Sequence, residues 1–213
     1  MAGQNVQNHY SGEDTGTSIA ARILAALRSV NGNDAAVTPK ALEPLDHFNA
    51  RGIEATQELA ALLEPQIGET ILDIGCGIGG PARWIAARYG CVVTGVDITT
   101  AFCEAARELR TACGMTDQVR IFVGSATVLP LPVATFDRAY SHGVLMSIAD
   151  KGAFFREAFR VLKPGGIALI SDYKGTGEYA DQFRGAGLAV EERRGSLITT
   201  FPPVTLVIAR KPV

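Results

Sequence analysis

Residues 71–80, ILDIGCGIGG, run from a short apolar segment into a turn that contains four glycines. An apolar run of this kind is typical of a buried strand in a parallel sheet, and the glycines let the backbone approach a ligand closely. Gly75, Gly77 and Gly80 formally match the G-x-G-x-x-G dinucleotide fingerprint. The stretch therefore indicates a bound adenosine-containing cofactor, either a nicotinamide or flavin dinucleotide or a molecule of another kind.

Downstream of the turn, helical and strand-like segments alternate. The expected helices cover residues 81–89, 100–113, about 151–162 and 178–185, and the expected strands 70–74, 91–97, 119–124, 136–141, 167–172, 188–194 and 204–210. This alternation predicts an α/β fold with a parallel sheet and right-handed crossovers. The last two strands have no helix between them, so we expect that pair to be antiparallel.

The N-terminal part of the chain does not follow this alternation. Apolar residues spaced for an amphipathic helix run from Ile19 to Leu27, and a further helix is expected over 53–63. Residues 29–46 contain two prolines and are expected to form a loop. We therefore divide the chain into an N-terminal helical cover, 1–52, and a cofactor-binding domain, 53–213, within one compact unit.

Composition excludes several classes of protein. A chain of 213 residues with 47% hydrophobic and 20% charged residues is long enough to bury a full core. We find no apolar run of membrane-spanning length and no secretory leader, so we expect a cytoplasmic protein with no membrane partner. The net charge of −2 argues against a nucleic-acid partner, and the oligomeric state stays open. Four cysteines without C-x-x-C spacing and three histidines predict no metal site.

Two aspartates narrow the choice of cofactor. Asp97, at the end of the second strand, is placed to accept hydrogen bonds from two ribose hydroxyls, as acids in NAD enzymes also do. Asp73 precedes the first glycine by two residues, where a pyrophosphate would approach the following helix. A carboxylate there suits a cofactor that carries an ammonium group and no phosphate, such as S-adenosylmethionine. An NAD-dependent oxidoreductase is the less favoured alternative.

The chain resembles class I S-adenosylmethionine-dependent methyltransferases over residues 45–173, through motifs in the family's order and spacing: ILDIGCGIGG, VTGVDIT, GSATVLPLPVATFD, AYSHGVLMSIADK and RVLKPGGIALISD. It is most similar to the small-molecule group (methyltransferase type 11) of ubiquinone/menaquinone C-methyltransferases and sarcosine/dimethylglycine N-methyltransferases. The resemblance implies a Rossmann-like, doubly wound sheet of seven strands, in the order 3-2-1-4-5-7-6 with the last strand antiparallel. It implies methyl transfer to nitrogen, oxygen or carbon of a small molecule, with S-adenosylhomocysteine as product. The alternative is a non-catalytic module that binds the cofactor or a partner.

The resemblance also implies roles for individual residues. The implied cofactor-binding residues are Asp73, Gly75, Cys76 and Gly77 in the glycine turn, Asp97 at the ribose, Ile98, Ser125 and Ala126 around the adenine, and Ser141, Arg51 and Gly52 at the methionine end. Tyr10 would face the reactive methyl from the N-terminal cover, and His142 would approach the methionyl part of the cofactor.

Holding the acceptor in line with the methyl group supplies much of the catalysis, but a hydroxyl or carbon acceptor also needs a base. His142 is the candidate base, because an imidazole titrates near neutrality, and its alternative role is to pack against the cofactor. Two features depart from the family pattern. Ser125 stands where an acidic residue usually binds the adenine, and the segment after the fifth strand is too short for a long lid. We therefore expect the acceptor pocket either to be formed mostly by residues 1–52 and the loop 141–150 or to be left open.

Overall fold

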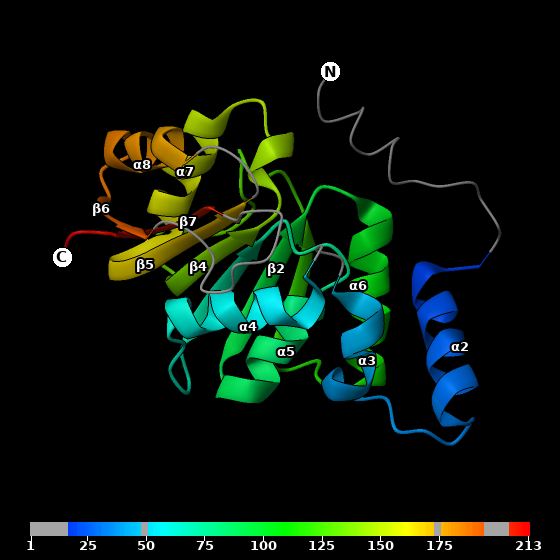
Figure 1. Cartoon of the computed structure of the whole chain (residues 1–213). Coiled ribbons are helices and arrows are strands. Elements are labelled where there is room, and N and C mark those ends of the chain that lie inside the picture. The colour runs from blue at the N-terminus through cyan, green and yellow to red at the C-terminus, as the bar shows by residue number, and fades with distance from the viewer. Residues whose placement is uncertain (1–16, 48–50, 173–175, 194–204) are drawn as a thin grey trace.

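Seven strands form one sheet in the computed structural model of the chain, which describes residues 17–47, 51–172, 176–193 and 205–213 (Figure 1). The strands are β1 Thr70–Ile74, β2 Val92–Asp97, β3 Val119–Val123, β4 Phe136–His142, β5 Leu162–Asp172, β6 Ala189–Arg193 and β7 Thr205–Arg210. Their order is β3-β2-β1-β4-β5-β7-β6. Strands β1 to β5 are parallel to one another, and β7 is antiparallel to both of its neighbours, β5 and β6. The expected strand order and the antiparallel final pair are confirmed.

Helices cover both faces of the sheet. They are α2 Ile19–Asn31, α3 Pro39–Asp46, α4 Gly52–Leu63, α5 Gly80–Tyr89, α6 Thr100–Ala112, α7 Lys151–Val161 and α8 Thr176–Gly185, with a 3-10 turn, η1, at Leu145–Ser147. Apolar residues of α4, α5 and α6 pack on one face, and those of α7 and α8 on the other. A third apolar cluster joins α2 and α3 to α6 and to Ile78 of the glycine turn. Helices α2 and α3 therefore lie against α6 and the glycine turn and not against the centre of the sheet (Figure 1).

The prediction of a loop over residues 29–46 is confirmed for residues 32–38 and wrong for the two ends of that range. The helix α2 continues to Asn31, and α3 occupies Pro39–Asp46. Thr38 caps α3 by accepting a hydrogen bond from the Ala41 amide, and Pro39 stands in the first turn, where its missing N–H costs nothing. Pro44 lies close enough to the end of the helix to remove only one late hydrogen bond.

Other element boundaries differ by a few residues. Helix α5 begins and ends as expected, with Pro81 in its first turn and Gly90 in a left-handed conformation after it. Strand β5 starts at Leu162, five residues before the expected start, because Leu162 already pairs with Phe136 of β4; the register then shifts, and Ile167 pairs with Arg138. None of the helices among the described residues has the length and apolar character needed to cross a membrane.

Candidate functional site

The glycine turn between β1 and α5 depends on backbone conformations that favour glycine. Gly75, Gly77 and Gly79 have φ angles of 84°, 52° and 76°. A Cβ atom on Gly75 would stand 2.4 Å from Cγ2 of Val144, which follows β4, so this glycine also permits a close contact. The Cβ position of Gly77, in contrast, has no atom within 4 Å. The turn is therefore tightly packed at Gly75 and open at Gly77, as a surface that receives a ligand must be.

Asp97 is fixed beside the open part of this turn. Its Oδ2 accepts a hydrogen bond from the Gly77 amide at 2.9 Å, and its Oδ1 accepts one from the Thr99 amide at 2.8 Å. Each carboxylate oxygen retains a further lone pair for a hydroxyl donor. The partly buried carboxylate is thus held rigidly at the end of β2, in an arrangement suited to a ribose. Ile98, also partly buried, follows it directly.

Asp73 lies on β1 with its carboxyl group buried, at 2% exposure. Its Oδ2 accepts a hydrogen bond from the Tyr140 hydroxyl at 2.8 Å, because the parallel register places these two residues side by side. Burial raises the pKa of Asp73 to about 7, against the lowering effect of the Tyr140 hydrogen bond, and the charge of Asp97 raises it further. A cation next to this carboxyl group would favour its ionised form. The sequence analysis missed Tyr140, although the expected pairing of these strands could have located it.

His142 ends β4 and lies near the junction between α3 and α4. Its Nδ1 is buried and has no hydrogen-bond partner among the described residues. Burial lowers the pKa of His142 to about 4, and the nearby His47 and Arg51 act in the same direction. The imidazole is therefore neutral at physiological pH, and the expectation of titration near neutrality is not met. The role of His142 as a base or as a cofactor contact stays a prediction.

Arg51 and Gly52 start α4. The Arg51 guanidinium forms an ion pair with Glu58, with Nη1 2.6 Å from Oε2, and both side chains are only 5% exposed. Gly52 has a φ of 52° and open space where a side chain would stand. In the same junction, His47 Nδ1 lies 2.9 Å from the Thr56 hydroxyl. The structure thus brings the start of α4 and the end of β4 together, as the expected methionine end of the site requires.

Two other predicted residues, Ser141 and Cys76, make contacts that limit their roles. Ser141 is buried, and its hydroxyl donates to the Ile74 carbonyl at 2.8 Å, joining β4 to β1. Cys76 is 6% exposed and packs against β2, since its Sγ lies 2.7 Å from the Cβ position of Gly95. The Cys76 amide donates to the Val96 carbonyl and its carbonyl accepts from the Gly79 amide, so the role of Cys76 in cofactor binding stays a prediction.

The loop after β3 and the N-terminal segment hold the remaining predicted residues. Ser125 Oγ lies 2.8 Å from the Thr127 hydroxyl and accepts from the Thr127 amide, and Ala126 packs at the edge of the α7–α8 core. Tyr10 lies outside the described residues. The role of each of these residues in cofactor binding stays a prediction.

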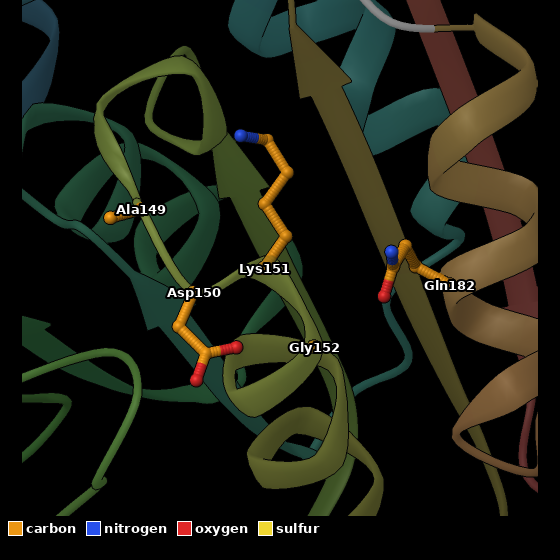
Figure 2. A pocket seen from close by; sticks show the side chains of 5 residues that line it. All are labelled: Ala149, Asp150, Lys151, Gly152 and Gln182. Atoms are coloured by element: carbon orange, nitrogen blue, oxygen red, sulfur yellow. The ribbon is translucent and has the colours of Figure 1, made fainter.

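A wide, shallow hollow of about 620 Å³ lies between the start of α7 and α8 (Figure 2). Its lining residues are Ala149, Asp150, Lys151, Gly152 and Gln182. Figure 2 shows Lys151 and Gln182 on opposite sides of it, one from each helix. Lys151 Nζ donates to the Ile148 carbonyl, and Asp150 caps α7 through the Ala153 amide. Part of the predicted acceptor loop, 141–150, therefore borders this polar hollow.

The described residues contain no group of three potential ligands able to hold a metal ion. What they do bring together is a glycine turn open at Gly77, a fixed carboxylate at Asp97, a buried carboxyl group at Asp73 and an imidazole whose Nδ1 has no partner among them. Asp97 can accept hydrogen bonds from ribose hydroxyls beside the open turn, and Asp73 suits an ammonium group. Together they fit a nucleoside that carries a cationic amino-acid tail.

Known proteins resemble this chain in sequence and in fold. Residues 72–170 match the family model described as "Methyltransferase domain". A "Phosphoethanolamine N-methyltransferase" of Triticum aestivum is 40% identical over 133 residues, which are 62% of this chain and 26% of the relative. The chain thus spans about a quarter of the length of this relative.

Two solved structures share the fold. The crystal structure of the "[4+2]-Cyclase SpnF" has a TM-score of 0.71 and 20% identity, and the match covers 99% of this chain and 97% of the other. The Haemonchus contortus phosphoethanolamine N-methyltransferase 2, in complex with S-adenosyl-L-methionine, has a TM-score of 0.66 and 19% identity, covering 89% of this chain and 57% of the other.

Proposed function

We propose that the chain is a class I S-adenosylmethionine-dependent methyltransferase that transfers a methyl group to a small molecule, since residues 72–170 match the methyltransferase-domain model. The observation that carries the proposal is the Asp97 carboxylate, held by the Gly77 amide beside the open part of the turn. The four free cysteines support a reducing compartment, the cytoplasm, as its location.

The cofactor, when bound, supplies a methyl group already activated by its sulfonium sulfur. The chain's own residues would bind the cofactor and orient its methyl group. In this proposal Asp97 accepts hydrogen bonds from the ribose hydroxyls, Asp73 attracts the ammonium group and Arg51 attracts the carboxylate. Their fixed positions hold the methyl group in line with an acceptor, an effect worth about 7–11 kcal/mol.

The methyl acceptor, in our proposal, is a small molecule. Relatives are named for phosphoethanolamine, a methylenesterol and a phytyl hydroquinone. The low pKa of His142 makes its imidazole a weak base, which favours an acceptor that arrives without a proton to lose, such as a neutral amine. Hydroxyl and carbon acceptors are the competing outcomes.

Thermal unfolding tests the cofactor assignment first. A ligand at about 100 times its Kd stabilises by roughly 2.7 kcal/mol, which for a chain of this size raises Tm by roughly 5–11 °C. We expect this rise with S-adenosylmethionine and S-adenosylhomocysteine but not with NAD. Asp97→Ala should abolish it, and the matched control Asp117→Ala, at an exposed aspartate, should leave it unchanged.

Methyl transfer is then measured with radiolabelled S-adenosylmethionine against amine, hydroxyl and activated-carbon acceptors. Transfer to any of them supports the enzyme. Cofactor binding without transfer to the whole panel favours the non-catalytic module, and a rise in Tm with NAD alone favours an oxidoreductase.

A further inference from the structure

Arg83 of α5 is fully buried, at 0% exposure, yet carries a positive charge. Its Nη2 donates to Asp46 Oδ2 at 2.5 Å, and its Nη1 donates to the Ile78 carbonyl at 2.8 Å. A buried charge is strongly destabilising when its partner is lost. The guanidinium therefore links the last residue of α3 to a carbonyl inside the glycine turn. Nothing in the sequence marks this arginine as buried.

The backbones meet at the same place. A Cβ atom on Gly80 would stand 2.1 Å from the Asp46 carbonyl oxygen, so the end of α3 rests directly on the first residue of α5. The side chain of Ile78 packs in the apolar cluster formed with α2, α3 and α6. Ile78 is thus held from two sides, through its side chain by the N-terminal helices and through its carbonyl by Arg83.

The charge of Asp46 depends mainly on Arg83. Burial raises the pKa of Asp46, and Arg83 opposes that effect. The second carboxylate oxygen, Oδ1, has no hydrogen-bond partner among the described residues, and His47 Nε2 lies 3.6 Å from it. Because burial lowers the pKa of His47, this imidazole is not a strong source of positive charge. Arg83 and Asp46 therefore form a largely self-contained pair.

The pair lies one peptide from the cofactor contact. Ile78, whose carbonyl Arg83 holds, directly follows Gly77, whose amide orients the Asp97 carboxylate. Only the 77–78 peptide group separates the Ile78 carbonyl from the Gly77 amide, so fixing the carbonyl restricts the positions that the amide can take. The geometry of the ribose acceptor thus depends on how the end of α3 docks on the turn.

We propose that Asp46 and Arg83 are positioning residues for the cofactor: by joining α3 to the glycine turn, they set the conformation in which the turn and Asp97 bind S-adenosylmethionine. This inference rests on the proposed function for its ligand. Neither side chain needs to touch the cofactor, and the N-terminal helices become part of the cofactor site through them.

The test compares two arginines of the same chemistry. Arg138 also binds one carboxylate and one carbonyl, with Nε 2.6 Å from Glu69 Oε2 and Nη1 2.5 Å from the Leu63 carbonyl, but near the start of β4. Arg83→Lys and Arg138→Lys both retain the charge and lose the planar fork. The Kd for S-adenosylmethionine is measured by calorimetry at a temperature far below the Tm of every variant, so that all are folded.

We expect Arg83→Lys to raise the Kd at least tenfold, and Arg138→Lys to change it less than twofold while still lowering the Tm. Asp46→Asn, which keeps its volume and can still accept a hydrogen bond, should also raise the Kd and decides the question if Arg83→Lys does not fold. A Kd within twofold of wild type in a folded Asp46→Asn variant, or an equal rise in Arg138→Lys, would overturn the inference. No binding by the wild type would instead overturn the proposed function.

Discussion

Asp137 and Asp73 lie on neighbouring central strands, at opposite ends of them, and have opposite electrostatic environments. Asp137, near the start of β4, receives hydrogen bonds from Lys163 Nζ at 2.7 Å and from the amide and hydroxyl of Thr70 at 2.9 and 2.7 Å. Although burial acts to raise it, these contacts bring the pKa of Asp137 below its usual value. Asp73, near the end of β1, is raised by burial to a pKa of about 7 and is bonded by the Tyr140 hydroxyl.

Within the folded chain, the Asp137 carboxylate has cationic and hydrogen-bonding partners, whereas the buried Asp73 has one hydroxyl donor and a raised pKa. Asp137 stabilises the folded chain, whereas an ionised Asp73 costs free energy until a positive group arrives. Perturbed pKa values of the second kind gather at functional sites. His142, whose pKa is also perturbed, lies at the same carboxyl ends of the strands. We therefore expect the ligand to bind beyond these ends.

The largest effect should come from neutralising each aspartate in turn. We expect Asp73→Asn to weaken S-adenosylmethionine binding by about 30-fold or more, since a buried charge contact is typically worth at least about 2 kcal/mol. Asp137→Asn should leave the Kd unchanged and lower only the Tm. Calorimetric titration and thermal unfolding of both variants measure the two effects. Similar Kd values for the two variants would remove Asp73 from the cofactor site.

The pH dependence of binding should follow Asp73. Its raised pKa means that it is protonated below about pH 7, and the cofactor's ammonium group binds the ionised form. With a pKa of about 7, the affinity should therefore fall about fivefold between pH 7 and pH 6. Calorimetry at half-unit intervals measures this slope, which Asp73→Asn should flatten. Tyr140→Phe removes the hydrogen bond that lowers the pKa of Asp73, so it should move the midpoint of the profile to higher pH. A midpoint that stays in place would show that another group titrates.

The smallest effect concerns stability in acid. The folded-state pKa of Asp137 lies below the usual value of 3.8, so its contribution to the free energy of unfolding is present above about pH 4 and is lost as the pH falls through the folded pKa. The partly exposed pair with Lys163 limits this contribution to about 1 kcal/mol or less. Chemical denaturation of wild type and Asp137→Asn between pH 2 and pH 6 should give curves that converge in acid. Parallel curves would contradict the assignment.

The sequence could predict what depends on local pattern. Alternating segments located every strand, and the resemblance to a family supplied the strand order. Since the sequence shows no helical pattern between the last two expected strands, it also predicted that they pair antiparallel. The sequence also indicated that the turn after the first strand needs glycines, and Gly75 and Gly77 do have positive φ angles.

What the sequence could not predict depends on tertiary contacts. Thr38 and Pro39 are a helix start that two prolines in one segment concealed. The resemblance implied that Ser141 and Cys76 bind the cofactor, but packing against neighbouring strands turns their side chains inward. The pairing of Arg83 with Asp46 joins residues 37 positions apart, and no local pattern encodes it.

The contact between Gly75 and Val144 has a consequence for the kinetics of the reaction. Val144 follows β4, in the loop that we predict to border the acceptor, and lies against Gly75 of the turn that we propose binds the cofactor. If an acceptor displaces this loop, we expect the two substrates to be thermodynamically coupled, so that each alters the affinity of the other by the same factor. In steady-state terms, the Michaelis constant for one substrate should depend on the concentration of the other, and initial-rate plots should intersect away from the axis.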